Sequence, residues 1–155
     1  MRRFLHFLAT DDRRLHVLSA KTEYACVALA RLAAEQGAAQ PLQGRRLAAE
    51  EGIPEGFLVQ ILQELKRLGL VTSTRGASGG YRLARSADEL SLGEALDLLD
   101  GPPAGPCNAT NPSSLGVAIN AAVSDAAEAE RERLRGVTLA DLVADAASPA
   151  EMYYI

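Results

Sequence analysis

The side chains best suited to binding chemistry in this chain are amides and cations gathered in one short stretch. Gln60 and Gln63 are three residues apart, and Lys66 and Arg67 follow three and four residues after Gln63. On a helix, this spacing places the four side chains along one side. A glutamine amide can form paired hydrogen bonds with the edge of an adenine, and a lysine or arginine can bind phosphate. The pattern favours contact with nucleic acid, provided that a helix presents these residues to solvent.

A second group of candidates follows in a glycine-rich segment. Arg75 stands beside Gly76, and Ser78, Gly79 and Gly80 follow after Ala77. An arginine at such a tip can enter a minor groove, and backbone N–H groups free of side chains can reach phosphates. A nucleotide-binding loop is excluded, because the segment lacks both the Lys-Ser/Thr of a P-loop and the strand-to-helix context of a dinucleotide fingerprint. A plain hairpin turn is the alternative.

The remaining reactive side chains form no catalytic or metal-binding set. The two cysteines, Cys26 and Cys107, are too far apart for a disulfide scaffold or a zinc ribbon. Both histidines, His6 and His16, lie in the first sixteen residues, which argues against a metalloenzyme with several histidine ligands. The sequence shows no pair of a nucleophilic residue and a general base that would indicate a catalytic site. We therefore expect no enzymatic activity, no metal and no cofactor.

Composition and charge narrow the class of protein further. The chain has 155 residues, 48% of them hydrophobic, which suits one globular domain or one domain with an appendage. With no apolar run of the roughly 18 residues that a membrane helix needs and no signal-peptide pattern, we expect a cytoplasmic protein without a membrane partner. The net charge is −4, yet residues 41–85 contain seven Lys/Arg against four Glu, whereas residues 86–155 contain three Arg against twelve Asp/Glu. The basic middle predicts a local anion-binding surface.

The elements that must position the candidate residues can be read from the hydrophobic period. Apolar residues at helical spacing predict three helices, and a change to alternation then predicts two short strands around the glycine turn. The expected bounds are residues 19–37, 43–51 and 54–69 for the helices, and 71–75 and 81–83 for the strands.

Within this region, the spacing of Ala48, Gly52 and Leu58 is typical of a helix-turn-helix. The small residue lets two helices touch, the glycine makes the turn, and the apolar residue anchors the second helix. The hairpin that follows makes the motif a winged one, in a mainly α fold. The second helix would enter the major groove with the side chains that its core face leaves free. These are Gly56, Val59, Gln60, Gln63, Lys66 and Arg67.

Three helices are expected after the wing. Ser91 and Glu94 form a candidate capping box for the first, and the proline-rich residues 101–107 then interrupt regular structure. A long helix is expected over residues 112–135 and a short one over residues 138–146. One side of the long helix carries Leu115, Ile119, Val123 and Ala126.

Taken together, the chain from about residue 18 to residue 146 resembles the Rrf2 family of bacterial transcription regulators. The matching stretches are residues 21–25, 53, 57–62, 65–71, 75–76, 79–83, 91–95 and 137–142. The resemblance implies a winged DNA-binding domain at residues 18–100, a loop at 101–112 in the family's sensor position, and a dimerisation part at 113–155. It further implies that Lys21, Thr22 and Tyr24 help to bind DNA, and that the apolar side of the long helix forms a homodimer.

The sequence departs from the cluster-bearing members of the family at the sensor loop. Those members have three closely spaced cysteines there, whereas this loop has only Cys107, so we expect no iron–sulfur cluster. Cys26 is expected to be a small buried hydrophobe. The alternative is that Cys26 and Cys107 act as redox thiols, alone or paired across the dimer. A small-molecule effector held near the loop is the other route for a signal.

We therefore predict a sequence-specific transcriptional regulator, a repressor rather than an activator, that binds a two-fold operator in double-stranded DNA as a homodimer. The first alternative is a winged-helix module that binds protein and no longer binds DNA, as the acidic C-terminal half would suit. The second is a ligand-binding or enzymatic domain with the 101–112 loop as a lid. Residues 1–17 are expected to be disordered or absent from the natural product; otherwise they form a basic arm on DNA.

Overall fold

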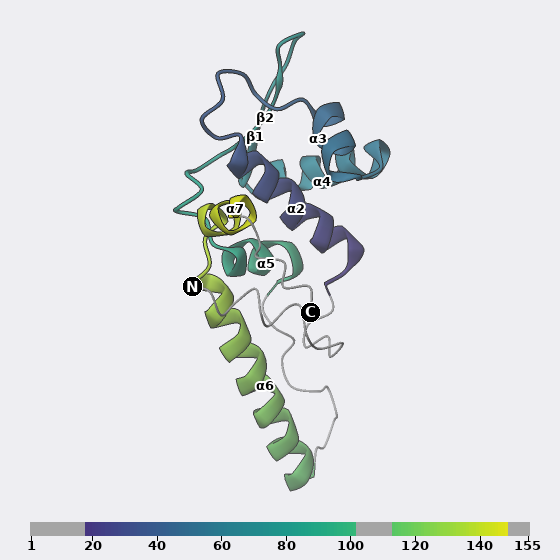
Figure 1. Cartoon of the computed structure of the whole chain (residues 1–155). Coiled ribbons are helices and arrows are strands. Elements are labelled where there is room, and N and C mark those ends of the chain that lie inside the picture. Colours follow the sequence, from purple (N-terminus) through teal and green to yellow (C-terminus); the bar gives the residue numbers. More distant parts are fainter. Residues whose placement is uncertain (1–17, 102–112, 149–155) are drawn as a thin grey trace, which may run out of the picture.

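The computed structural model describes residues 18–101 and 113–148, which form a mainly helical fold with one two-stranded sheet (Figure 1). The two strands pair antiparallel, with Val71 opposite Leu83 and Thr74 opposite Gly80. The expected fold class is confirmed. None of the helices within the described ranges is long and apolar enough to cross a membrane. The elements are α2 (Ala20–Ala34), α3 (Gly44–Glu51), α4 (Glu55–Arg67), β1 (Val71–Thr74), β2 (Gly80–Leu83), α5 (Leu92–Asp100), α6 (Ser114–Arg135) and α7 (Leu139–Ala147).

The helix-turn-helix forms where the spacing predicted it. Ala48 is buried on α3 and Leu58 on α4, so the two helices pack closely beside the turn. Gly52 ends α3 with a φ of +64°, a left-handed conformation that a side chain disfavours. Ile53 closes the turn by donating its backbone N–H to the carbonyl of Ala48. The orientation of α4 is therefore fixed at its beginning.

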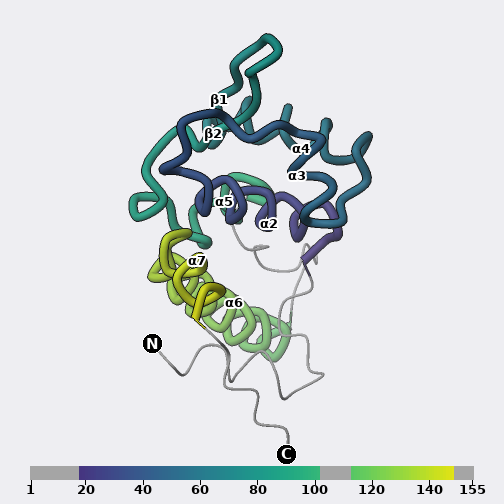
Figure 2. Tube along the Cα trace, turned by 45° about the horizontal axis from the view of Figure 1, so that its top comes forward, coloured from purple at the N-terminus to yellow at the C-terminus, as the bar shows by residue number. Residues whose placement is uncertain are grey.

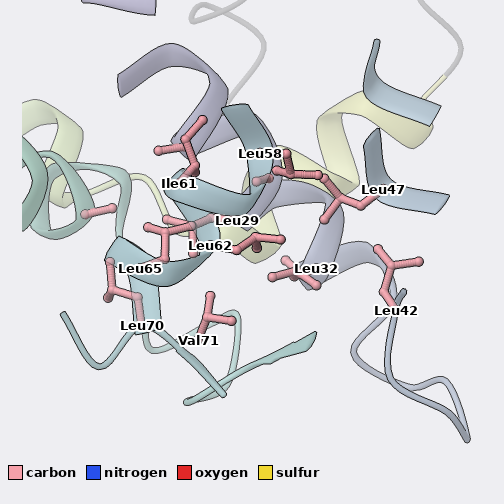
Figure 3. Close-up of a cluster of buried hydrophobic side chains, with 14 of the residues drawn as sticks. Leu29, Leu32, Leu42, Leu47, Leu58, Ile61, Leu62, Leu65, Leu70 and Val71 are labelled. Carbon is pink, nitrogen blue, oxygen red and sulfur yellow. The ribbon is translucent and has the colours of Figure 1, made fainter. Parts of the chain in front are cut away.

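A leucine-rich core holds the inner side of α4 (Figure 3). Leu29 and Leu32 of α2 and Leu47 of α3 belong to one buried cluster with α4 and with the start of β1. Because four side chains of α4 are buried, loss of any one of them would leave a cavity and cost about 2–5 kcal/mol. The exposed side chains on the outer side of α4 can be replaced without leaving a cavity. The buried residues of α4 are Leu58, Ile61, Leu62 and Leu65.

The predicted capping box at the start of α5 forms only in part. The Ser91 hydroxyl accepts the backbone N–H of Glu94, as expected. The Glu94 carboxylate, however, binds Arg85 at 2.5 Å instead of returning to the backbone of Ser91. A complete capping box forms at α7, where Thr138 and Asp141 each accept a backbone N–H of the other. The two helix starts pair through a bridge between Ser91 and Thr138.

Helix α6 projects from the rest of the chain and is attached near its C-terminal end (Figure 1). At this attachment, Gly93 of α5 lies so close to α6 that a Cβ would stand 2.5 Å from the backbone nitrogen of Arg135. On the first part of α6, the large apolar side chains Leu115, Ile119 and Val123 are exposed. Figure 2 shows the hairpin and α6 at opposite ends of the molecule, so α6 is remote from α3, α4 and the wing.

Candidate nucleic-acid interface

The outer side of α4 presents every residue that the sequence placed there. Each of these side chains is exposed, whereas the opposite side of the helix is buried in the core. Gln60 and Gln63 are one turn apart, so their amides can address neighbouring base edges. The exposed set comprises Gly56, Val59, Gln60, Gln63, Lys66 and Arg67.

Ion pairs and hydrogen bonds orient the cationic side chains beside α4. Lys66 Nζ donates to Ser73 Oγ at 2.7 Å, which links the end of α4 to strand β1. Lys21 at the start of α2 pairs with Glu64 at 2.5 Å, and Arg67 lies 3.7 Å from the same carboxylate. The Glu64 carboxylate thus lies between Lys21 and Arg67, beside the exposed side of α4. These exposed pairs contribute little to stability, so the cations remain free to exchange partners.

The wing extends the same surface with a tip that is tightly constrained. Arg75, Gly76 and Ser78 are exposed, as expected. Gln43, directly before α3, donates its side-chain amide to the carbonyl of Ala77 at 3.3 Å and so ties the turn to the helix-turn-helix. The hairpin is therefore positioned relative to α4 and does not project independently.

One predicted wing residue, Gly79, has a structural role in the turn. Gly79 is buried within the turn, where its N–H binds the carbonyl of Gly76 and a Cβ would stand 2.3 Å from the carbonyl oxygen of Thr74. It is therefore required for the turn and is not available to a phosphate. Gly80 also has a packing role, because a Cβ there would stand 2.5 Å from the carbonyl oxygen of Leu42, whose segment pairs with Tyr81. Only the first part of the glycine segment faces solvent.

At the start of α2, Lys21 is a candidate for contact with DNA, whereas Thr22 is buried. Lys21 is exposed, but Thr22 is only 2% exposed and donates its hydroxyl to Asp100 at 2.7 Å, so the Thr22 side chain has an internal partner and is not proposed as a DNA contact. Tyr24 is half-buried against Phe57 of α4, with ring centroids 5.7 Å apart and an edge-to-face angle of 80°. Tyr24 thereby supports the beginning of α4.

The structure adds one candidate beyond those chosen from the sequence. Arg45 lies in the first turn of α3, its side chain is 86% exposed, and it stands 3.9 Å from Glu55 at the start of α4. It therefore borders the same surface as Gly56. The signal in the sequence was the Arg45–Arg46 pair before the turn. The structure separates the two, because Arg46 is held by Glu35 and Glu50.

The cysteine that can be described is shielded. Burial raises the pKa of the Cys26 thiol to about 12, and the Asp100 carboxylate acts in the same direction, whereas Arg131 opposes it. At neutral pH the sulfur is therefore protonated and a poor nucleophile. Cys26 is part-buried rather than fully buried, and the raised pKa of its thiol argues against a redox role. Cys107 and most of the 101–112 loop lie outside the described residues, as does the expected extension at 1–17.

Comparisons with known proteins agree with this geometry. The model of the Rrf2 family, described as an iron-dependent transcriptional regulator, matches residues 18–145. The CymR regulator of Bacillus subtilis is 31% identical over 142 residues, which cover 89% of this chain and 99% of CymR. A putative HTH-type regulator of Mycobacterium tuberculosis is 45% identical over 85 residues, or 55% of this chain. That match covers 52% of the relative, so the chain aligns with about half of its length.

Solved structures show the same fold. The structure of B. subtilis CymR, named as a global cysteine regulator, has a TM-score of 0.73 and 28% identity, covering 84% of this chain and 98% of CymR. The IscR structure from T. potens has a TM-score of 0.68 and 30% identity, and the match covers 85% of this chain and 89% of IscR. An oxidized form of Staphylococcus aureus CymR has a TM-score of 0.65 and 27% identity, covering 83% and 96%.

The donor groups present do not fit the iron that the family description implies. An iron–sulfur cluster is normally held by about four thiolates, or by a mixture of thiolates and histidines. The chain has only two cysteines, and Cys26 is a shielded thiol with a raised pKa. Among the described residues, no group of three or more His, Cys, Asp or Glu side chains could hold a metal ion. The side chains of this chain therefore differ from those that a cluster requires.

Proposed function

Because the chain belongs to the Rrf2 family of transcriptional regulators, we propose that it represses transcription by binding a two-fold operator in double-stranded DNA as a homodimer. The family and its relatives regulate transcription and are not enzymes. The observation that carries the proposal is the exposed side of α4, which presents two glutamines and two cations beside the exposed Arg75 of the wing, while the opposite side of α4 is buried in the core.

On this surface, the residues divide by the part of DNA that they would contact. Gln60 and Gln63 would read base edges in the major groove, with a preference for adenine. The cations Lys21, Lys66 and Arg67 would bind phosphates on either side, and Arg75 would enter the neighbouring minor groove. Phosphate contacts of this kind make binding strongly dependent on salt concentration.

The second copy would pack on the projecting part of α6. Ile119 is 63% exposed in the single chain, and Leu115 and Val123 lie exposed one turn to either side of it. A large apolar side chain at three successive turns of a projecting helix is an unfavourable surface in water. Ala126 follows on the same side, where a small side chain lets a partner helix approach closely.

We further propose that the signal does not act through an iron–sulfur cluster. A small-molecule effector near the 101–112 loop and oxidation of Cys107 are the two routes that the donor groups favour, because the Cys26 thiol is shielded. The oxidized crystal form of S. aureus CymR supports an oxidative route by analogy. A regulator that acts on bacterial DNA would work in the cytoplasm.

Selection of duplexes from a random pool by the full-length chain, followed by gel shifts at several salt concentrations, tests the proposal. We expect Arg75→Ala to weaken binding by about 1–3 kcal/mol and Gln60→Ala to relax base preference. Arg133→Ala on α6 is the control, since it removes an exposed arginine outside the candidate surface. Failure to select any duplex would contradict DNA binding and favour the protein-interaction alternative, whereas activation of a bound promoter in a transcription assay would contradict repression.

A further inference from the structure

The outer side of α4 contains a glycine that the fold does not require. Gly56 is exposed, does not have a positive φ, and a Cβ placed on it would meet no described atom within 4 Å. Glycine weakens a helix relative to alanine, because it loses more backbone freedom on folding. Gly79 and Gly93 are different, since a Cβ at either would collide with backbone. No internal contact therefore accounts for glycine at this position in the first turn of α4.

Beside this glycine stands an exposed apolar side chain. Val59 is 48% exposed, and the other large exposed hydrophobic residues in the described part of the chain lie on α5 and α6. Residues three apart on a helix are surface neighbours, about 5–6 Å between Cβ atoms. The missing side chain at Gly56 therefore leaves an open space next to the two methyl groups of Val59. We call this space the Gly56–Val59 notch.

We propose that the Gly56–Val59 notch receives the 5-methyl group of a thymine in the major groove. The inference rests on the proposed binding of DNA by α4. Among the groups that base pairs present in the major groove, the thymine methyl is the apolar one, and apolar side chains contact it. Gly56 would let the helix backbone approach, Val59 would pack on the methyl, and Gln60 and Gln63 would bind adjacent bases. The notch would thus specify thymine at one position of each half-site.

The first test removes the methyl group from the DNA. Duplexes that the full-length chain selects from a random pool are prepared with single thymines replaced by deoxyuridine, which lacks only that methyl. At one position in a half-site, we expect the replacement to weaken binding about fourfold, the effect of burying one methyl-sized group. Val59→Ala should lose a similar factor, and deoxyuridine at that position should then have no further effect. The notch is refuted if no position responds, or if the response is the same in Val59→Ala.

The second test fills the notch from the protein side. Gly56→Ala should raise the melting temperature by about 1–4 °C, because alanine favours the helix. The same substitution should weaken binding to the thymine duplex, and deoxyuridine at the responsive position should relieve part of that loss. Gly37→Ala is the matched control, because a Cβ on Gly37 would also meet no described atom within 4 Å, although Gly37 lies outside the surface; it should bind like the wild type.

The outcomes separate this inference from the proposed function. If Gly56→Ala binds the thymine duplex as tightly as the wild type, the notch does not contact DNA, although α4 can still read it. If the wild-type chain selects no duplex at all, both the notch and the proposed function are wrong.

Discussion

The junction between α5 and α6 depends on one carboxylate between two guanidinium groups, and its removal should destabilise the protein strongly. The side chain of Arg131 is 5% exposed, and its Nε lies 3.1 Å from Asp97 Oδ1. Arg135 Nη2 binds the other oxygen of Asp97 at 2.9 Å from a more exposed position. Arg131 Nη1 has no hydrogen-bond partner among the described residues. Asp97 is therefore the main counter-charge of a buried cation.

The expected loss of stability follows from the difference in burial between Arg131 and Asp97. Removing one member of a buried ion pair costs about 3–5 kcal/mol, because the other charge stays buried and uncompensated. Asp97 is 26% exposed, so water can partly replace it, and we expect Asp97→Asn to cost about 2–4 kcal/mol. Arg131→Met should cost less, because Asp97 would keep Arg135 and reach solvent. The double variant should be more stable than Asp97→Asn alone.

Urea unfolding followed by far-UV circular dichroism provides the measurement. It should be run at two protein concentrations, because association of two copies would add to the apparent stability. The reasoning is refuted if Asp97→Asn lies within about 1 kcal/mol of the wild type, or if Arg131→Met is the more damaging substitution. Asp125→Asn, on the exposed part of the same helix, is the matched control and should change little.

Three further predictions concern the dimer, the thiol and the chain start. Ile119→Asp should place a carboxylate in the proposed interface at a cost of several kcal/mol, so sedimentation should find monomers; an intact dimer would contradict the role of α6. In a Cys107→Ser variant, Cys26 is the remaining thiol, and its alkylation near neutral pH should be about a thousandfold slower in the folded chain than in the unfolded chain. The reason is that folding raises the pKa of the thiol from its ordinary value of 9.0 to about 12. Equal rates in the two states would restore Cys26 as a redox candidate. Deletion of residues 2–16 should leave the slope of log affinity against log salt unchanged, whereas a smaller slope would show that they form a basic arm on DNA.

The helix-turn-helix could be predicted because its signals are local. Ala48, Gly52 and Leu58 act through contacts within a dozen residues, and the apolar period of α4 determines which side is buried. The exposed side of α4 is then the side opposite the residues that are buried in the core. The same logic placed the strands, since alternation around Val71 changes the period where α4 ends.

The sequence was least informative where a residue distant in the chain binds the polar group in question. Glu94 has the right spacing for a capping box, but Arg85 reaches its carboxylate from the exit of the wing. Thr22 matched a motif at a helix start, yet Asp100 from α5 binds its hydroxyl. Gly79 belongs to a segment that is exposed elsewhere, and only the folded turn shows the carbonyl of Thr74 beside it. Arg131 was unforeseeable for the same reason, because its burial depends on how α6 meets α5.

The contacts of Asp100 connect the start of the 101–112 loop to the proposed DNA-binding surface. Asp100 ends α5 directly before that loop and accepts the hydroxyl of Thr22, whose neighbour Lys21 pairs with Glu64 of α4. Asp100 is therefore linked to α4 through two polar contacts, of which the one at Thr22 is part-buried and the one at Lys21 joins an exposed lysine to a part-buried carboxylate. Exposed ion pairs are weak, so the link at Lys21 would limit any coupling through this route. The junction of Gly93 with Arg135 is closely packed, and it leads to α6, which in the proposed dimer would set the spacing of the two copies of α4 on DNA.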